Sequence, residues 1–208
     1  MPFVTHPRIR KVLGRVSMLT AVGVFASCGV AAAACPAQST STPFQRWGDT
    51  NSYFLAPGGD FENGLLSTWA PVAALPTVGN EPFYLHSVSD TTSVTVAGGG
   101  TVTSPPFCVD STMPYFRFLA HQRASGSDLK VTLVLLNGAT VLGSQVDSVG
   151  DLADGSMPVW APTAPLKLTY GLSVPAGQTL TAELVFQAGL GLGSWQIDDV
   201  YIDPYRTA

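Results

Sequence analysis

Two acidic stretches near opposite ends of the chain carry the side chains most able to do chemistry. In the first, GGDFENG, Asp60 and Glu62 are two residues apart and point to the same side of an extended segment. In the second, WQIDDVYID, the adjacent Asp198 and Asp199 point to opposite sides of a strand, and Asp198 shares its side with Val200. A carboxylate on an apolar side is partly buried, and a buried charge requires a partner.

A hard cation with several oxygen ligands would be such a partner. Few basic residues are present, and the one that lies near either stretch in the sequence is Arg206. Calcium binds carboxylate oxygens and suits an exported protein, so we expect a structural calcium ion held by Asp60, Glu62, Asp198 and Asp199. The alternative is that Glu62 caps a turn and Asp198 accepts hydrogen bonds from backbone N–H groups, with no metal.

A second set of residues has the chemistry of carbohydrate recognition. Sugar sites combine aromatic rings, which stack on pyranose faces, with polar side chains that bind hydroxyl groups. The candidate ligand-binding residues are Tyr84, His86, His121, Arg123 and Trp160. Tyr84 and His86 lie on the same side of an extended segment, which would allow one shared site. For each residue the alternative is a place in the core or on a surface that binds nothing.

No pattern in the sequence indicates an enzyme. The motifs G-x-S-x-G and H-E-x-x-H and a Gly-rich phosphate loop after a strand are absent, and VAGGGTV at 96–102 reads as a turn between two strand-like runs. After the first 34 residues, His86 and His121 are the histidines that could act as bases near neutral pH. Paired carboxylates can hydrolyse glycosides, but the acidic stretches have a structural explanation, so catalysis is not expected.

Residues 1–34 have the three parts of an export signal. Basic residues precede an apolar run at 16–30, and Ala32 and Ala34 suit an A-x-A cleavage site before Cys35. The run is shorter than the about 20 apolar residues that a membrane-spanning helix needs. The sequence therefore predicts a signal peptide and a secreted, extracellular protein.

The remaining residues, 35–208, contain six basic and fourteen acidic residues, a net charge of −8. Such a chain repels phosphate backbones, which disfavours nucleic acid as a partner. These residues contain no apolar run long enough for a transmembrane segment and no basic amphipathic helix. The expected partner is an extracellular polysaccharide or a protein surface, and the oligomeric state is not predicted.

The three cysteines fit an oxidising compartment. Cys28 lies in the signal peptide, which leaves Cys35 and Cys108 to form one disulfide bond across 73 positions. The chain-entropy model gives a closed loop of this length a stabilisation of roughly 4 kcal/mol. The alternative is a lipid anchor on Cys28 or Cys35, since each follows small residues; both lack the leucine usual three residues earlier.

The sequence after the lead-in alternates short β-rich runs with turn residues and shows no helical periodicity. Residues 35–52 read as an irregular lead-in, with Phe44 and Trp47 docking onto the domain. The Asn137–Gly138 pair predicts a hairpin, and prolines are expected mostly between strands. The predicted strands cover 91–96, 105–110, 115–121, 128–136, 139–147, 165–174, 179–187 and 194–202.

Inward-facing residues should occupy alternate positions of these strands. In the 128–136 run, every second residue from Leu129 is apolar, and the 179–187 run repeats the pattern from Leu180 to Phe186. About eight to ten strands without helices predict one all-β domain at 53–204. Its expected architecture is a two-layer antiparallel β-sandwich, with a closed barrel as the alternative.

The two acidic stretches also resemble motifs of a known family. Galactose-binding-like jelly-roll domains, among them carbohydrate-binding modules of families 4, 9 and 22, open with N-x-x-F-E-x-G and a following Trp and close with I-D-D-V-x-L. The resemblance implies that the first and last strands are neighbours beside a structural calcium ion, with Glu62 paired to Asp198. The matching residues are Phe61, Glu62, Gly64 and Trp69 at one end and Ile197, Asp198, Asp199, Val200 and Ile202 at the other.

Two functions fit these features. The first is a secreted, non-catalytic β-sandwich module that binds carbohydrate, as the resemblance implies. The second is an extracellular structural or adhesion domain that binds a protein or cell-wall surface without a sugar ligand. A binding module usually serves an enzyme fused to it, and this sequence contains no catalytic domain, which favours the second function as much as the first.

Overall fold

The computed structural model describes residues 35–64, 68–110, 112–149, 159–168 and 179–204; the predicted signal peptide lies outside them. Regular structure in the described residues is a short 3₁₀ turn followed by β-strands. No helix in this part of the chain is both long and apolar enough to cross a membrane. The elements are η1 (Gln45–Trp47), β1 (Phe54–Leu55), β2 (Ala70–Val78), β3 (Thr92–Thr103), β4 (Phe107–Val109), β5 (Tyr115–Ala124), β6 (Leu129–Asn137), β7 (Thr140–Ser148), β8 (Ala161–Pro162), β9 (Leu166–Lys167), β10 (Leu180–Ala188) and β11 (Ser194–Ile202).

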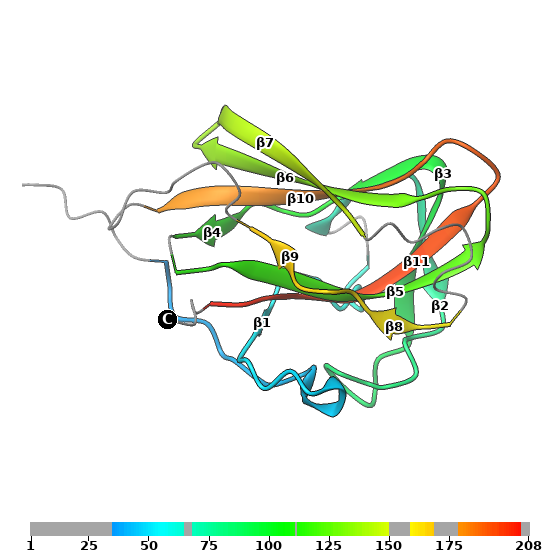
Figure 1. Ribbon diagram of the computed structural model, residues 1–208, viewed down its shortest axis with the longest axis horizontal. Coiled ribbons are helices and arrows are strands. Elements are labelled where there is room, and N and C mark those ends of the chain that lie inside the picture. Colours follow the sequence, from blue (N-terminus) through cyan, green and yellow to red (C-terminus); the bar gives the residue numbers. More distant parts are fainter. Residues whose placement is uncertain (1–34, 65–67, 111, 150–158, 169–178, 205–208) are drawn as a thin grey trace, which may run out of the picture. The chain divides into compact units, whose positions relative to one another are not determined.

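The strands form two antiparallel layers (Figure 1). One layer contains β7, β6, β10 and the second half of β3, with β4 beside β10. The other contains the first half of β3, then β11 and β5, with β1 beside β11 and with β8 and β9 beside β5. This is the predicted two-layer antiparallel β-sandwich, and its sheet curls from one layer into the other as in a jelly roll.

The long strand β3 belongs to both layers and bends between them at Gly98–Gly100. Its first half pairs with β11 and its second half with β10. A Cβ on Gly100 would stand 2.5 Å from the carbonyl oxygen of Ala73 on β2. The prediction of a turn at the three glycines is therefore wrong. They bend a continuous strand, because the backbones pass too close there for side chains.

Strand β2 differs from expectation in a related way. It contains Pro71 and Pro76 within the strand, where the sequence pattern placed prolines between strands. β2 pairs with β3 and lies at the edge of the sheet, where a residue without an N–H donor is tolerated. Its register with β3 shifts at Ala73, so the bends in the two strands coincide.

The main core lies between the layers and follows the predicted alternation. Inward residues of β6 and β10 are buried, and Gly138 adopts a φ of 58° in the β6–β7 hairpin that Asn-Gly predicted. Phe61 and Trp69 pack together with ring centres 5.0 Å apart, and Trp69 also packs on Phe186. Both act as the core anchors that the family motif implied. The alternating buried residues are Leu129, Val131, Leu133 and Leu135 on β6 and Ala182, Leu184 and Phe186 on β10.

The lead-in docks on the outer face of β5 and β11, the face turned away from the main core. Phe44 is fully buried there, and the Arg117 guanidinium lies 4.4 Å above its ring. Arg117 donates to Asp49 Oδ2 and to the carbonyl of Thr163, and Tyr53 donates its hydroxyl to the same Asp49 oxygen at 2.7 Å. The predicted docking of Phe44 is confirmed.

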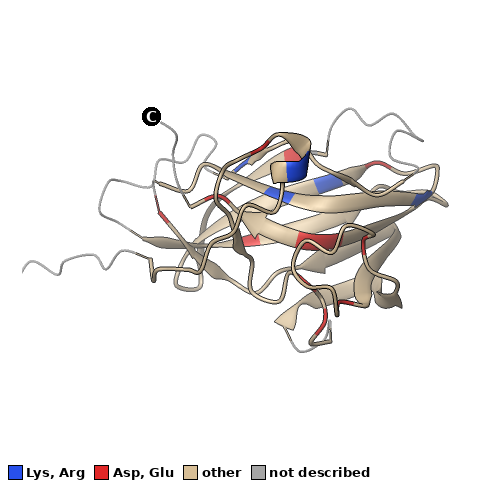
Figure 2. Ribbon diagram, turned by 90° about the horizontal axis from the view of Figure 1, so that it is seen from below, with Lys and Arg blue, Asp and Glu red and all other residues tan. Residues whose placement is uncertain are grey.

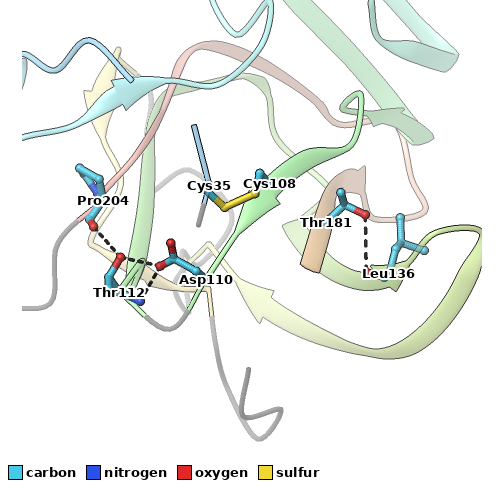
Figure 3. Close-up of a disulfide and its surroundings, with 7 residues drawn as sticks. All are labelled: Cys35, Cys108, Asp110, Thr112, Leu136, Thr181 and Pro204. Atoms are coloured by element: carbon cyan, nitrogen blue, oxygen red, sulfur yellow. Dashed lines mark hydrogen bonds between the residues drawn. A yellow bond between two sulfur atoms is a disulfide. The ribbon is translucent and has the colours of Figure 1, made fainter. Parts of the chain in front are cut away.

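The predicted disulfide bond joins Cys35 to Cys108 on β4 (Figure 3). It connects the start of the lead-in to the layer that contains β10. Beside it, Asp110 accepts a hydrogen bond from the backbone N–H of Thr112 at 2.8 Å, and the Thr112 hydroxyl reaches the carbonyl of Pro204 at 3.1 Å. Because the Cys35 sulfur is bonded to Cys108, it is not available to carry a lipid.

Candidate functional site

The opening and closing motifs of the domain meet at β11. Ala56 donates its backbone N–H to the carbonyl of Val200 at 2.8 Å, and Val200 donates to the carbonyl of Gly59 at 3.0 Å. β1 pairs with the end of β11, where Phe54 lies opposite Ile202. The expectation that the two ends of the domain are neighbours is confirmed.

A β-bulge at Asp199 changes the side that each later residue of β11 faces. Asp199 adopts a φ of 51°, and the register with β5 shifts between Asp198 and Tyr201. Asp198 lies opposite Leu119 on the outer face, whereas Val200 packs into the main core. The prediction that Asp198 and Val200 share a side is wrong, because one extra residue inverts the alternation.

Asp198 holds a loop that is far from it in the sequence. Its Oδ2 accepts a hydrogen bond from the backbone N–H of Glu81 at 3.2 Å. Glu81 is fully buried and accepts from the backbone N–H groups of Phe83 and Leu85, the latter at 2.6 Å. Two buried carboxylates therefore hold the loop between β2 and β3 in place. The sequence signal for Glu81 was weak: an acid before a proline in a turn-rich stretch.

Glu62, expected to pair with Asp198, binds the end of this same loop, residues 79–91. Its Oε1 accepts the backbone N–H groups of Thr91 at 2.7 Å and Thr92 at 2.5 Å, and its Oε2 accepts the Thr91 hydroxyl at 3.2 Å. The structure gives Glu62 the turn-capping role that the sequence left open. Glu62 therefore holds the backbone of the 79–91 loop, where pairing with Asp198 was expected.

His86, in the 79–91 loop, is exposed and lies beside two buried carboxylates. Its Nδ1 lies 2.9 Å from Asp90 Oδ2 and 3.5 Å from Asp60 Oδ2. The loop is not extended, since Tyr84 adopts a φ of 52°, so the alternation that placed Tyr84 and His86 on one side does not apply. The structure separates the two: His86 contacts acids, and Tyr84 faces solvent.

Five buried carboxylates lie on β11 and in the loops next to it. Figure 2 colours all acidic positions of the described chain red, on strands and on loops. We call Asp60, Glu81, Asp90, Asp198 and Asp199 the acidic cluster. Both carboxylate oxygens of Asp199 and Oδ1 of Asp60 are buried without a hydrogen-bond donor, and a bond between the Asp199 and Glu81 carboxylates would need a shared proton. The cluster therefore requires protons or a cation.

The raised pKa values of Asp198 and Asp199 also show that the acidic cluster disfavours ionised carboxylates. Burial, and after it the charge of Asp199, raises the pKa of Asp198 to about 10. Burial, and after it the charge of Glu81, also raises the pKa of Asp199. Removal from water disfavours each carboxylate, and the nearby acids add repulsion.

The donor atoms of the acidic cluster suit calcium, because the atoms that lack partners are carboxylate oxygens. Across the described residues, however, no three His, Cys, Asp or Glu side chains converge in a way that could hold a metal ion. A calcium ion bound by Asp60 and Asp199 would take backbone carbonyls or water as its other ligands.

Aromatic side chains gather on the outer face of β5 and β11. Phe83 and Trp160 pack against a buried apolar cluster that is separate from the main core. Trp47 lies edge-on to Phe83 with ring centres 4.9 Å apart, and Trp160 lies 5.6 Å from His121. Tyr84 is 50% exposed and Trp47 is 36% exposed. We call Trp47, Phe83, Tyr84, His121 and Trp160 the aromatic face.

Of the predicted ligand-binding residues, His121 and Trp160 lie together on this face, and Tyr84 follows Phe83 directly in the 79–91 loop and is half-exposed. Arg123 is exposed on β5, two residues beyond His121. Phe83 was not predicted as a ligand residue, and Trp47 was expected only to dock the lead-in. The sequence could not show that the lead-in and the 79–91 loop meet on this face.

Comparison with known proteins gives no sequence relative: no family model and no curated protein matches this chain. The fold is similar to the enzymatically active domain of tailspike protein 4 from bacteriophage CBA120, with a TM-score of 0.50 and 13% identity over 71% of this chain and 21% of that one. The chain has a jelly-roll-like, two-layer antiparallel β-sandwich fold.

Two solved carbohydrate-binding modules are also similar. One is TmCBM61, solved with β-1,4-galactotriose (TM-score 0.44, 15% identity, 71% of this chain and 96% of that one). The other is the CBM22-1 xylan-binding domain of Xyn10C from Paenibacillus barcinonensis (TM-score 0.46, 14% identity, 72% and 94%). At these identities the likeness concerns the fold and leaves the ligand open.

Proposed function

We propose that this chain is a secreted, non-catalytic module that binds carbohydrate on the aromatic face. The observation that carries the proposal is the group of partly exposed rings, Trp47, Phe83 and Trp160, on one side of the β5–β11 layer, with the exposed Tyr84 next to Phe83 in the chain. Sugar rings present C–H groups that stack on aromatic faces, and side chains that are already held by packing lose less entropy when they bind.

The fixed conformation of Tyr84 supports this role. A tyrosine in the left-handed region is strained by an amount on the order of 1–3 kcal/mol, and such strain is found where surrounding structure enforces it. Here Glu81 binds the backbone N–H groups of Phe83 and Leu85, on either side of Tyr84. A buried carboxylate thereby holds an exposed ring in a defined orientation.

Export and the absence of catalysis are parts of the same proposal. The basic and apolar composition of residues 1–34 and the disulfide bond of Cys35 with Cys108 support passage through an oxidising compartment. The carboxylates that could serve a glycosidase are engaged elsewhere: Glu81 and Asp198 anchor backbone in the interior, and Glu62 binds Thr91.

We also propose that a calcium ion balances the acidic cluster, with Asp60 and Asp199 among its ligands. Their buried oxygens without donors support this, as does the raised pKa of Asp199. The ion would replace the protons that the buried carboxylates otherwise need and would stabilise the 79–91 loop. Thermal melting in calcium and in EGTA tests this; the same midpoint in both would remove the metal.

Binding of the purified protein to a glycan array, followed by titration with the glycans that bind, tests the carbohydrate function. We expect saturable binding to one polysaccharide class. Tyr84→Ala and Trp160→Ala should each weaken it by about tenfold or more, since a lost aromatic contact of a desolvated ring costs one or two kcal/mol. Leu192→Ala, which also removes an exposed apolar side chain, is the matched control and should bind as the parent does.

One observation favours the second function, adhesion to a protein or cell-wall surface. Leu190 and Leu192, in the β10–β11 loop, are 92% and 98% exposed, more than a domain needs for its own stability. A blank glycan array together with recovery of a specific protein partner, lost in Leu190→Ala but kept in Tyr84→Ala, would establish this function instead.

A further inference from the structure

Arg46 is attached to the aromatic face by ring contacts. Its guanidinium carbon lies 4.4 Å from the centre of the Phe83 ring and 5.2 Å from that of Trp47. The residue is exposed, so the edge of the guanidinium that carries the N–H donors reaches solvent. Stacking on two rings restricts the side chain, which reduces the entropy lost when those donors bind a ligand.

Two other basic side chains form ion pairs with acidic residues. Arg117 is buried in its ion pair with Asp49, and Lys130 pairs with Asp128. Among the described residues, no acidic side chain forms an ion pair with Arg46. Arg46 therefore brings a fixed positive charge to a surface whose neighbours are rings.

Building on the proposed carbohydrate-binding function, we propose that the aromatic face selects polysaccharides that contain uronic acids, with Arg46 binding the sugar carboxylate. The planar guanidinium forms two parallel hydrogen bonds to a carboxylate, which a neutral sugar cannot offer. The carboxylate of a uronate lies at the edge of the pyranose ring, so a sugar ring beside the exposed Trp47 would bring its charged group to Arg46.

Because the chain has a net negative charge, the proposed binding of uronates depends on short-range contacts within the site. Residues 35–208 carry a net charge of −8, which repels polyanions at long range. At physiological ionic strength charges farther apart than about 8 Å are largely screened, so contacts within the site decide the outcome. A general attraction to anionic polymers is therefore not expected, and a change at one arginine should be decisive.

The test uses polygalacturonate, the same polymer with its carboxyl groups methyl-esterified, and dextran sulfate. We expect the full chain to bind polygalacturonate about tenfold more tightly than the ester, the effect of one charge-assisted pair. Arg46→Gln should abolish this preference, Arg46→Lys should restore only part of it, and Lys130→Gln should leave it intact. Equal unfolding midpoints of the variants would show that they are folded.

Equal binding of polygalacturonate and its ester, or equal binding of dextran sulfate and polygalacturonate, would overturn the proposal. So would a preference that survives in Arg46→Gln. If the glycan array finds a neutral ligand that needs Tyr84 while polygalacturonate does not bind, selection of uronates fails and the carbohydrate function stands. If no glycan of either kind binds, both fail.

Discussion

Two carboxylate sites next to the β5–β11 layer are stabilised in opposite ways: the part-buried Asp49 of the lead-in, and the buried Asp198 and Asp199 on β11. Asp49, in the lead-in, accepts hydrogen bonds from the buried Arg117 and from Tyr53. Asp198 and Asp199, on β11, are surrounded by further acids and by backbone N–H groups. Both groups attach a loop to the same sheet.

The pKa values follow this difference. Burial by itself would raise the pKa of Asp49, but the hydrogen bonds from Tyr53, Asn51 and Arg117 outweigh it and hold that pKa below its usual value. The pKa of Asp198 rises to about 10, because burial and the charge of Asp199 act in the same direction. A cation inside the chain makes one site self-sufficient, whereas the other depends on what the solution supplies.

The largest effect should come from removing the cation of the self-sufficient site. Arg117→Met leaves the part-buried Asp49 without its charge partner, and breaking this largely buried pair should cost about 3 kcal/mol of unfolding free energy. Urea denaturation measures it. The control is Lys130→Met, whose ion pair with Asp128 is half-exposed and should contribute under about 0.5 kcal/mol. Equal losses in both variants would refute the contrast.

The pH dependence of stability should distinguish the two sites next. Between the ordinary pKa of 3.8 and the folded value of about 10, Asp198 binds a proton in the folded chain that it has lost in the unfolded chain. Stability in EGTA should therefore fall as pH rises, by roughly 1.4 kcal/mol per pH unit for one proton, or about 2–3 kcal/mol from pH 5.5 to 7.5.

Asp49 adds no slope in that window, because its lowered pKa leaves it ionised in both states above about pH 5. Saturating calcium should flatten the fall if the ion replaces the proton in the acidic cluster. Stability in EGTA that stays constant or rises from pH 5.5 to 7.5 would show that Asp198 is not held as a neutral acid.

Neutralising one carboxylate in each group should change stability in opposite directions. Asp49→Asn replaces an ionised acceptor beside Arg117 and should cost about 2 kcal/mol at pH 7.5. Asp198→Asn keeps an oxygen for the Glu81 N–H group and loses the bond from the Asp199 N–H group. It also removes the need to bind a proton on folding, so in EGTA it should raise stability by about 1 kcal/mol. Denaturant midpoints in matched buffers decide the signs; a loss in both variants would contradict the comparison.

Much of the fold could be predicted, because period-two alternation and turn residues are local signals. The strands β6, β7, β10 and β11 were predicted to within one or two residues, and the disulfide bond followed from a cysteine count. The errors at Gly98–Gly100 and Asp199 share a cause. In both places the backbone changes direction within a strand, and alternation assumes a regular backbone.

The acidic cluster was harder to predict, because its members come from three separate segments. The sequence indicated Asp60, Asp198 and Asp199 but gave no means to add Glu81 or Asp90, which reach the cluster through a loop without periodicity. The aromatic face was incomplete for the same reason: Trp47 and Phe83 meet only when the lead-in docks. Whether Asp60 and Asp199 bind calcium stays a prediction.

The smallest expected effect tests whether the two regions communicate. Trp47 belongs to the lead-in that Asp49 and Arg117 attach, and Phe83 to the loop that the acidic cluster holds; their rings touch edge to face at 4.9 Å. A double-mutant cycle of Trp47→Ala and Phe83→Ala should give a coupling of about 0.5–1.5 kcal/mol.

Repeating the double-mutant cycle in calcium and in EGTA tests whether the acidic cluster affects the Trp47–Phe83 contact. If the acidic cluster sets the position of Phe83, the Trp47–Phe83 coupling should be larger in calcium than in EGTA, whereas the cost of Arg117→Met should be the same in both. A coupling near zero in both conditions would mean that the lead-in and the 79–91 loop are independent attachments to one sheet. The aromatic face would then be two half-sites that a ligand must bring together, and its affinity would be correspondingly lower.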